Sequence, residues 1–148
     1  MTDNELLDRF APCGLDCSRC FAREGGAVQL PALELRQSLR GFEALAARMA
    51  ERAPELADYP QFQAVLAVLC EASCPGCRAG GGHLPTCSAR TCHREKRVGF
   101  CFQCDEYPCE RNTYHASLHD RWRRYNDRMG EVGVEQFAAE QAMEPRFE

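Results

Sequence analysis

Apolar side chains recur at helical spacing in the middle of the chain and predict an antiparallel pair of helices over residues 31–70. The first helix is expected from Pro31 to about Arg52, because proline suits the first turn of a helix and Pro54 would stop it. The second helix is expected to begin near Pro60. Steps of three and four residues place one apolar stripe on each helix. These stripes consist of Leu35, Leu39, Phe42, Leu45, Ala46, Met49, Phe62, Val65, Leu66, Leu69 and Cys70.

The C-terminal part predicts a longer helix from about Glu110 to Met129 and a short final helix, which together span about residues 110–143. Gly130 and Gly133 are expected to separate the two helices. The apolar positions of the longer helix again follow helical spacing. Its predicted buried stripe consists of Tyr114, Leu118, Trp122, Tyr125 and Met129.

The remaining patterns complete a mainly α fold. Residues 3–10 predict one helical turn capped by Thr2 or Asp3, and only residues 97–102 have the composition of a small β-ribbon. We therefore expect a small helical domain with irregular cysteine-rich metal-binding loops. At 148 residues, the chain 1–148 is expected to be a single domain.

Two stretches that are poor in aliphatic residues contain ten of the 11 cysteines. They span residues 13–20 and 74–109, on either side of the predicted helical pair. Cys70 follows the helical stripe instead and is assigned to the core. The ten candidate metal ligands are Cys13, Cys17, Cys20, Cys74, Cys77, Cys87, Cys92, Cys101, Cys104 and Cys109.

The spacing of these cysteines is typical of metal ligands. In the second stretch two pairs, Cys74/Cys77 and Cys101/Cys104, have two intervening residues, which lets a tight turn aim both sulfurs at one point, as a tetrahedral ion requires. Several turns between cysteines carry glycine or proline, which favour tight turns: Gly14, Pro75, Gly76 and Pro108. The preferred first site consists of the two pairs Cys74, Cys77 and Cys101, Cys104. The preferred second site consists of Cys13, Cys17, Cys20 and either Cys109 or Cys92.

Charge and hydropathy narrow the class of protein. The chain has 18 Lys and Arg against 22 Asp and Glu, and no apolar run approaches the roughly 20 residues that span a bilayer. The acidic N-terminus lacks the layout of a secretory signal, which favours a cytoplasmic location without membrane association. Thiols stay reduced there, and an odd number of cysteines cannot all pair. Metal binding is therefore favoured over a disulfide framework.

Zinc is the expected metal, because it is redox-silent and accepts four thiolates, and ten thiols suffice for two zinc ions. The alternative is a [4Fe–4S] cluster, since cysteine spacing separates zinc from iron–sulfur poorly. Residues 13–20 share the C-x3-C-x2-C spacing of radical S-adenosylmethionine enzymes, but the chain lacks the strands of their barrel. The cations expected to balance the thiolates are Arg78, Arg90, Arg94, Lys96, Arg97 and Arg111.

Histidines add little to this ligand set. His115 and His119, one helical turn apart, are interpreted as half-exposed residues beside the aromatic stripe rather than as a metal pair. His83 lies within the second cysteine-rich stretch, where imidazole is an acceptable zinc ligand, and it is a candidate substitute for a cysteine.

Other functions receive weaker support. The basic residues between positions 121 and 128 suggest a nucleic-acid surface, but Asp120 and Asp127 interrupt them, so nucleic-acid binding is not expected. A catalytic thiol needs a facing base, and the adjacent Cys92 and His93 are poorly placed for this, as is Cys109. No catalytic residue is predicted, the interpretation leans to a non-enzyme, and the expected partner is another protein. Nothing indicates an oligomeric state.

Three motifs together resemble a known family. They are C-G-L-D-C-S-R-C from Cys13, C-P-G-C-R from Cys74, and the stretch from Cys87 to the Y-P-C that ends at Cys109. In this order they are similar to the domain of unknown function 3795 family. The tail at residues 124–137 is similar to that family's N-x-x-x-x-x-x-G-[VL]-E-x-[WF] stretch.

The chain departs from the family pattern at two positions. Leu84 stands where members often carry a further cysteine, and Ala89 replaces the usual isoleucine. Because the family has no established activity, the resemblance implies cysteine-rich metal binding and no particular reaction. We expect a zinc protein with a structural or partner-binding role. The alternative is an iron–sulfur protein in electron transfer or redox sensing.

Overall fold

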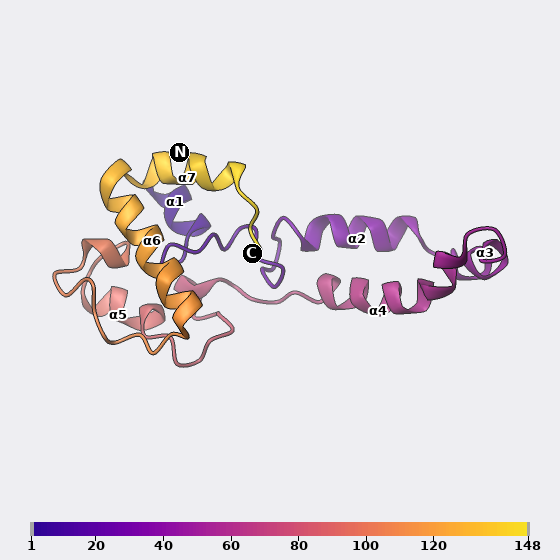
Figure 1. The fold of residues 1–148 in the computed structure, drawn as a ribbon, viewed down its shortest axis with the longest axis horizontal. Helices are drawn as coiled ribbons and strands as arrows, with labels where there is room; N and C mark the ends of the chain where they lie inside the picture. The colour runs from indigo at the N-terminus through magenta and orange to yellow at the C-terminus, as the bar shows by residue number, and fades with distance from the viewer. Residues whose placement is uncertain (1, 148) are drawn as a thin grey trace. The chain divides into compact units, whose positions relative to one another are not determined.

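In a computed structural model, which describes residues 2–147, the chain consists of α-helices joined by irregular loops, without a named strand in that range (Figure 1). The mainly α fold expected from the sequence is confirmed. The chain forms two compact units, one from residues up to Cys20 and from Cys74 onward, and the other from Phe21–Ser73. The assignment of 1–148 as a single domain stays a prediction.

The unit at residues 21–73 is built on the predicted helical pair. Helices α2 (Gln29–Ser38) and α4 (Tyr59–Cys70) run antiparallel, as Figure 1 shows, and their contacts enclose a small core. Between them lie α3 (Glu43–Met49) and the 3-10 turn η1 (Pro54–Asp58). The core consists of Ala32, Leu66 and Cys70, so Cys70 is a core residue as expected.

The first predicted helix of this pair is divided into two. The apolar pattern predicts one helix from Pro31 to Arg52, whereas α2 ends at Ser38 and α3 begins at Glu43. Gly41 lies between them with a φ of +79°, a left-handed conformation that glycine adopts at little cost. The glycine therefore ends a helix that the apolar periodicity alone would continue.

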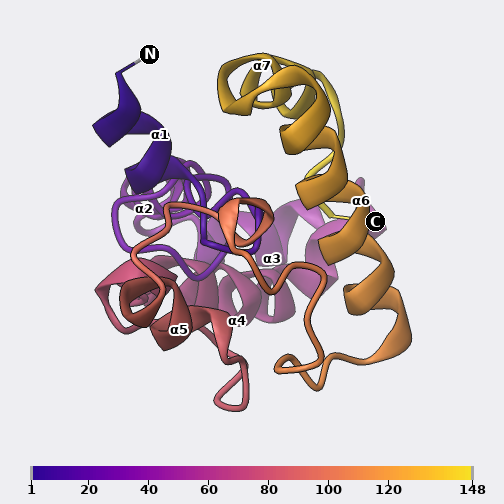
Figure 2. The same ribbon diagram turned by 90° about the vertical axis from the view of Figure 1, so that its left-hand side faces the viewer.

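The other unit contains α1 (Asp3–Arg9), α5 (Ala89–Glu95), α6 (Ala116–Val132) and α7 (Val134–Met143), with 3-10 turns η2 (Cys77–Ala79) and η3 (Cys101–Gln103). Thr2 caps α1 through a reciprocal bond with Glu5, which confirms the predicted N-terminal turn. Helices α6 and α7 meet at a corner (Figure 2), and α1 packs against α7. The core of these helices consists of Leu6, Phe10, Phe100, Tyr125, Met129, Phe137 and Ala138.

The helix α6 begins and ends later than its sequence predicts. It starts at Ala116 rather than Glu110, and it continues through Gly130 to Val132. Gly133, with a φ of +82°, then separates it from α7. The segment before α6 makes hydrogen bonds to side chains rather than the backbone hydrogen bonds of a helix; for example, the Ser88 hydroxyl donates to the carbonyl of Arg111 at 2.7 Å.

The small ribbon expected at residues 97–102 does not form. The backbone N–H of Cys101 donates to the carbonyl of Pro12 at 2.9 Å, so this segment pairs with the first cysteine-rich stretch rather than folding back on itself. It then turns into η3. This bond brings the two cysteine-rich stretches together.

Asp16 organises the loop of the first cysteine-rich stretch. Its side chain is 0% exposed and accepts hydrogen bonds from Arg9 Nε at 3.0 Å and Arg19 Nε at 3.1 Å. Ser18 adds bonds from its backbone N–H at 3.0 Å and its hydroxyl at 2.6 Å. Burial alone raises the pKa of Asp16, but the bonds from Ser18 and Arg9 outweigh it and hold the pKa below its ordinary value. The ionised carboxylate therefore fixes this loop.

Candidate metal centre

One buried side chain on α6 holds both cysteine-rich stretches. Asn126 is 0% exposed, and its Oδ1 accepts a hydrogen bond from the backbone N–H of Phe102 at 3.0 Å. Its Nδ2 donates to the carbonyls of Cys13 and Trp122, both at 2.9 Å. The backbones beside Cys13 and Cys101 are thus fixed on the same helix, which places thiols from distant parts of the chain in one region.

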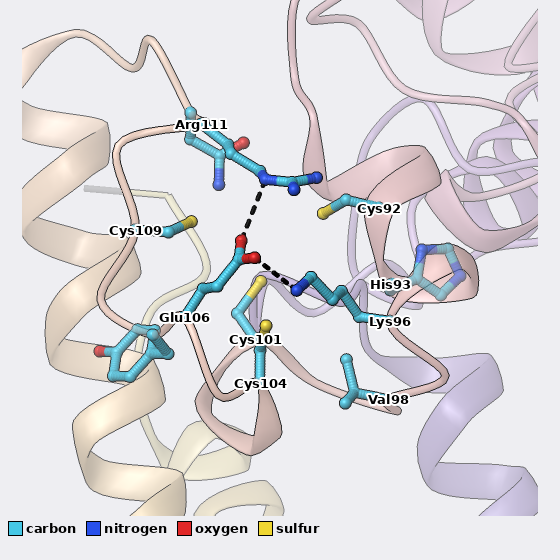
Figure 3. Close-up of a pocket in the computed structure, with 11 residues that line it drawn as sticks. Cys92, His93, Lys96, Val98, Cys101, Cys104, Glu106, Cys109 and Arg111 are labelled. Carbon is cyan, nitrogen blue, oxygen red and sulfur yellow. Dashed lines mark hydrogen bonds and ion pairs between the residues drawn. The ribbon is translucent and has the colours of Figure 1, made fainter.

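Four thiols of the second stretch line one small cavity, which we name the Cys92 pocket. Cys92 comes from α5, Cys101 from η3, Cys104 follows η3, and Cys109 precedes α6. In Figure 3 the sulfurs of Cys92 and Cys109 lie on opposite sides of the Glu106 carboxylate, and those of Cys101 and Cys104 lie below it. Four thiolates are the donor set that Zn²⁺ takes in closed structural sites.

Charged side chains border the Cys92 pocket. The carboxylate of Glu106 accepts a hydrogen bond from Lys96 Nζ and forms an ion pair with Arg111 Nε at 3.1 Å (Figure 3). Lys96 also pairs with Asp105 at 3.4 Å. Two of the cations expected from the sequence therefore lie beside thiols, where they can balance the negative charge of a metal–thiolate group.

Two buried N–H donors near the Cys92 pocket lack normal hydrogen-bond partners. Asn112 is 7% exposed and lines the pocket; its Oδ1 accepts from the backbone N–H of Ala89 at 3.2 Å, while its Nδ2 has no partner within the described part of the chain. Trp122 is 2% exposed, and its indole N–H, also unpartnered at normal distance, lowers the pKa of the Cys101 thiol. Unpaired buried donors are costly, and anionic sulfur would satisfy them.

Two thiols of the Cys92 pocket, Cys92 and Cys101, have raised pKa values. Burial raises the pKa of Cys101 to about 12, and the neighbouring thiolates of Cys92 and Cys109 raise it further. Burial likewise raises the pKa of Cys92, and the thiolate of Cys109 adds to the effect. A bound dication reverses this preference, because thiolates replace thiols when they ligate a metal.

The remaining predicted ligands lie elsewhere in the same unit. Cys13, Cys17, Cys77 and Cys87 gather around one apolar cluster, whereas Cys20 and Cys74 are not among its members. The same cluster also contains Cys101 and Cys109, so Cys77 and Cys101 pack against one apolar group, and the grouping expected from spacing stays a prediction. Spacing identifies adjacent pairs, but the fold decides which pairs meet.

The side chains that line the Cys92 pocket are of the chemical types that bind a metal ion, but their ligand atoms are not placed around one point. Among residues 2–147, no three Cys, His, Asp or Glu side chains are placed so that they can hold one ion together. The donor types, the bordering cations and the unpaired Asn112 Nδ2 favour such an ion. Binding would therefore have to draw the sulfurs of the pocket together.

The histidines have different surroundings, and one of them, His93, lines the Cys92 pocket. His115 is exposed and bonds to Ser117 Oγ at 3.2 Å, and His119 packs against Trp122 with ring centroids 5.3 Å apart. His93 is buried, and its Nδ1 lies 2.9 Å from the carbonyl of Ala89. His83 is exposed. The assignment of His115 and His119 to the edge of the aromatic stripe agrees with these contacts.

Sequence reasoning missed the polar residues that support the thiols. Asn112 carries no periodic or motif signal, and Asn126 begins the N-x-x-x-x-x-x-G-[VL]-E-x-[WF] stretch without that motif indicating its role. The roles of both residues depend on which backbone atoms the fold brings near them. Tyr114 was expected in the stripe of a helix, whereas it precedes α6 and reaches the Cys87 sulfur, with 3.0 Å between its Oη and the Sγ. Only a three-dimensional arrangement reveals these contacts.

Comparison with known proteins places most of the chain in one family. The model of a family described as protein of unknown function (DUF3795) matches residues 9–114, which confirms the resemblance that the cysteine motifs carry. No curated protein and no solved structure matches the chain. Within the described residues, none of the helices has the length and apolarity to cross a bilayer.

Proposed function

Because the chain belongs to the DUF3795 family of proteins of unknown function, we propose a role from its own residues: it binds metal through thiolates, and the metal is structural. The proposed ion is zinc, held in the Cys92 pocket by Cys92, Cys101, Cys104 and Cys109. The observation that carries the proposal is that four thiols line one cavity together with the buried Asn112, whose Nδ2 has no partner among residues 2–147.

The proposed metal replaces apolar core that this region lacks. The segment from Cys92 to Cys109 contributes few aliphatic side chains. It is linked to the helices by packing of Phe100 and Tyr107 and by hydrogen bonds such as that from Phe102 N–H to Asn126. Structural zinc sites contribute apparent binding free energies of about 10–16 kcal/mol at neutral pH, which then become folding free energy. The ion would tie α5, η3 and the segment before α6 to one point.

Contacts of the basic residues on α6 support the expectation of no nucleic-acid binding. Arg123 lies 3.7 Å from Asp127, and Arg128 pairs with Glu131 at 3.1 Å and with Glu140 at 2.7 Å. Paired arginines offer little uncancelled charge to phosphates. The same proposal includes a non-catalytic role and binding to another protein.

The test is elemental analysis of protein purified anaerobically under reducing conditions, with a visible spectrum of the same sample. We expect zinc and no colour. If the sample contains iron and its visible absorption is bleached by dithionite, the bound group is an iron–sulfur cluster and not zinc. Absence of both metals would overturn the proposal.

Hydrogen exchange then tests the structural role. Stripping the metal with a chelator is expected to abolish amide protection in α5 and α6, which adjoin the thiols, while α2 and α4 keep theirs. The second pair is an internal control, because its unit contains none of the proposed ligands. Unchanged protection in α5 and α6 after complete stripping would show that the metal does not hold the fold.

A further inference from the structure

A small cavity, which we name the Arg36 pocket, lies in the unit at residues 21–73, where α2, α3 and α4 meet (Figure 1). Its volume is about 160 Å³. Cavities of about 150 Å³ with apolar walls hold a molecule of the size of benzene. All residues that line the Arg36 pocket belong to this unit, so the cavity is separate from the thiols of the Cys92 pocket.

The turn that divides the predicted first helix also shapes the Arg36 pocket. Gly41, with a φ of +79°, leaves Arg40 beyond the end of α2 and places Glu43 at the start of α3, and both of these residues line the pocket. Phe42 lies between them and packs edge-on against Tyr59 of α4, with ring centroids 5.2 Å apart. This contact holds the turn against α4, so packed side chains set the outline of the cavity.

The buried side chains that line the Arg36 pocket are mainly apolar. Leu66 and Tyr59 of α4 are buried, and Leu39 at the end of α2 is half-buried. Leu66 also belongs to the small core of this unit, which keeps this part of the wall in place. An apolar group that entered the pocket would leave water and contact these side chains, which favours its binding.

Two exposed cations border this apolar surface. Arg36 and Arg40 are four positions apart at the C-terminal end of α2, and both line the pocket. Within residues 2–147, neither side chain forms a hydrogen bond or an ion pair. The two guanidinium groups therefore have free N–H donors, whose planar arrangement matches the two oxygens of a carboxylate.

The other charged group of the pocket does not cancel these cations. The side-chain amide of Gln63 donates to Glu43 Oε1 at 2.6 Å, so the Glu43 carboxylate is bound by a neutral group. Two guanidinium groups and one carboxylate leave the lining of the pocket with one net positive charge. A ligand with a single negative charge balances this lining.

We propose that the Arg36 pocket binds a small monocarboxylate whose apolar part is about the size of a benzene ring. Its carboxylate pairs with Arg36 and Arg40, and its apolar part lies against Leu39 and Leu66. This ligand-binding function goes beyond the proposed metal-binding role and does not depend on it, because the unit at residues 21–73 contains none of the proposed metal ligands.

Benzoate is the probe, since it combines one carboxylate with one benzene ring. Its binding to the full chain is followed by chemical-shift changes in an NMR titration up to about 50 mM, at constant ionic strength. We expect saturable binding with a Kd of about 1 mM or lower, and shift changes at the amides of α2, α3 and α4. Arg36→Gln and Arg40→Gln are each expected to weaken binding by at least about 10-fold. The matched controls are Arg48→Gln and Arg52→Gln, which remove exposed arginines of the same unit that do not line the pocket and should leave the Kd unchanged.

Two further measurements separate charge from shape. Glu43→Gln removes the carboxylate that opposes the ligand and is expected to tighten benzoate binding. Benzyl alcohol, a neutral molecule of similar shape, is expected to bind at least about 10-fold more weakly than benzoate. Because Arg36 and Arg40 are exposed, their variants should fold, and an unchanged helical circular dichroism signal checks this.

The opposite results would overturn the inference. Absence of saturable shift changes with the wild type would exclude the site, whatever metal the protein contains. If the double variant Arg36→Gln/Arg40→Gln kept the affinity of the wild type, the two arginines would serve only the C-terminal end of α2, where the helix dipole favours cations. Equal weakening by Arg48→Gln would show that benzoate responds to net charge, and equal binding of benzyl alcohol would show an apolar cavity without recognition of a carboxylate.

Discussion

Replacement of Asn126 by leucine tests whether α6 holds the two cysteine-rich stretches in place. Leucine is similar in size to asparagine and favours helices more, so packing and helix propensity change little. The substitution removes the bond from Phe102 N–H and the bonds to the carbonyls of Cys13 and Trp122. The perturbation is therefore a loss of polar partners at a fully buried position.

The magnitude follows from the groups left unpaired. Trp122 C=O keeps its helical partner inside α6, so Phe102 N–H and Cys13 C=O account for the loss. Each unsatisfied buried backbone group costs about 1–3 kcal/mol. Phe102 is half-buried, so its N–H partly regains water, and we expect a total of about 2–4 kcal/mol. For a domain of roughly 60–100 residues this lowers the Tm by roughly 10–20 °C.

Urea unfolding followed by tryptophan fluorescence is the suitable assay. The chain has one tryptophan, Trp122, which is buried beside Asn126 in α6, so the signal reports on this unit. Gln136→Leu is the matched control, because Gln136 is an exposed amide on α7 and its loss should change stability by at most about 0.5 kcal/mol. If Asn126→Leu lowers the free energy of unfolding by less than about 1 kcal/mol relative to this control, the hydrogen bonds of Asn126 to the two cysteine-rich stretches are not important for stability.

Two further substitutions test the first cysteine-rich loop. Gly14→Ala should cost about 2–4 kcal/mol, because φ is +89° and an added Cβ would lie 3.1 Å from Tyr125 Cβ and 2.8 Å from Cε of the fully buried Met129. Gly133→Ala, at φ +82° with nothing within 4 Å of an added Cβ, should cost only about 1 kcal/mol, and equal losses in urea unfolding would contradict the steric argument. Asp16→Asn should cost about 2–4 kcal/mol by weakening the bonds from two arginines, compared with at most about 0.5 kcal/mol for Asp120→Asn, whose side chain is 84% exposed. Thermal unfolding at matched metal content checks this, and similar Tm values for the two variants would rule out a stabilising role for the Asp16 network.

The sequence predicted the helices better than their ends. Apolar periodicity located α2, α4, α6 and α7. The stripes predicted for α2 and α4 are buried only in part, since Leu66 and Cys70 are buried whereas Leu35 and Val65 are exposed. It could not show that Gly41 divides the first helix, since a single glycine inside a periodic pattern is compatible with either outcome. It also placed the start of α6 too early, because Tyr114 continues the apolar spacing. In the structure Tyr114 precedes α6, and its hydroxyl contacts the Cys87 thiol.

The candidate site could be predicted by residue type but not by grouping. Cysteine content and spacing identify the ten thiols, since local turns determine which sulfurs within a stretch lie close together. The partners between stretches depend on long-range contacts, such as the bond from Cys101 N–H to the Pro12 carbonyl. No local pattern carries that information. Spacing alone therefore does not show that Cys92 and Cys109 line the pocket with Cys101 and Cys104.

The discontinuous unit has a consequence for synthesis on the ribosome. Cys17 and Cys77 are 60 positions apart, and at about 5–20 residues per second the intervening chain takes about 3–12 s to make. The α2–α4 hairpin can fold within this delay, because its core lies entirely between residues 21 and 73. The first thiols are therefore exposed for seconds before the thiols of the second cysteine-rich stretch exist. The rate of translation would determine how long they are open to oxidation.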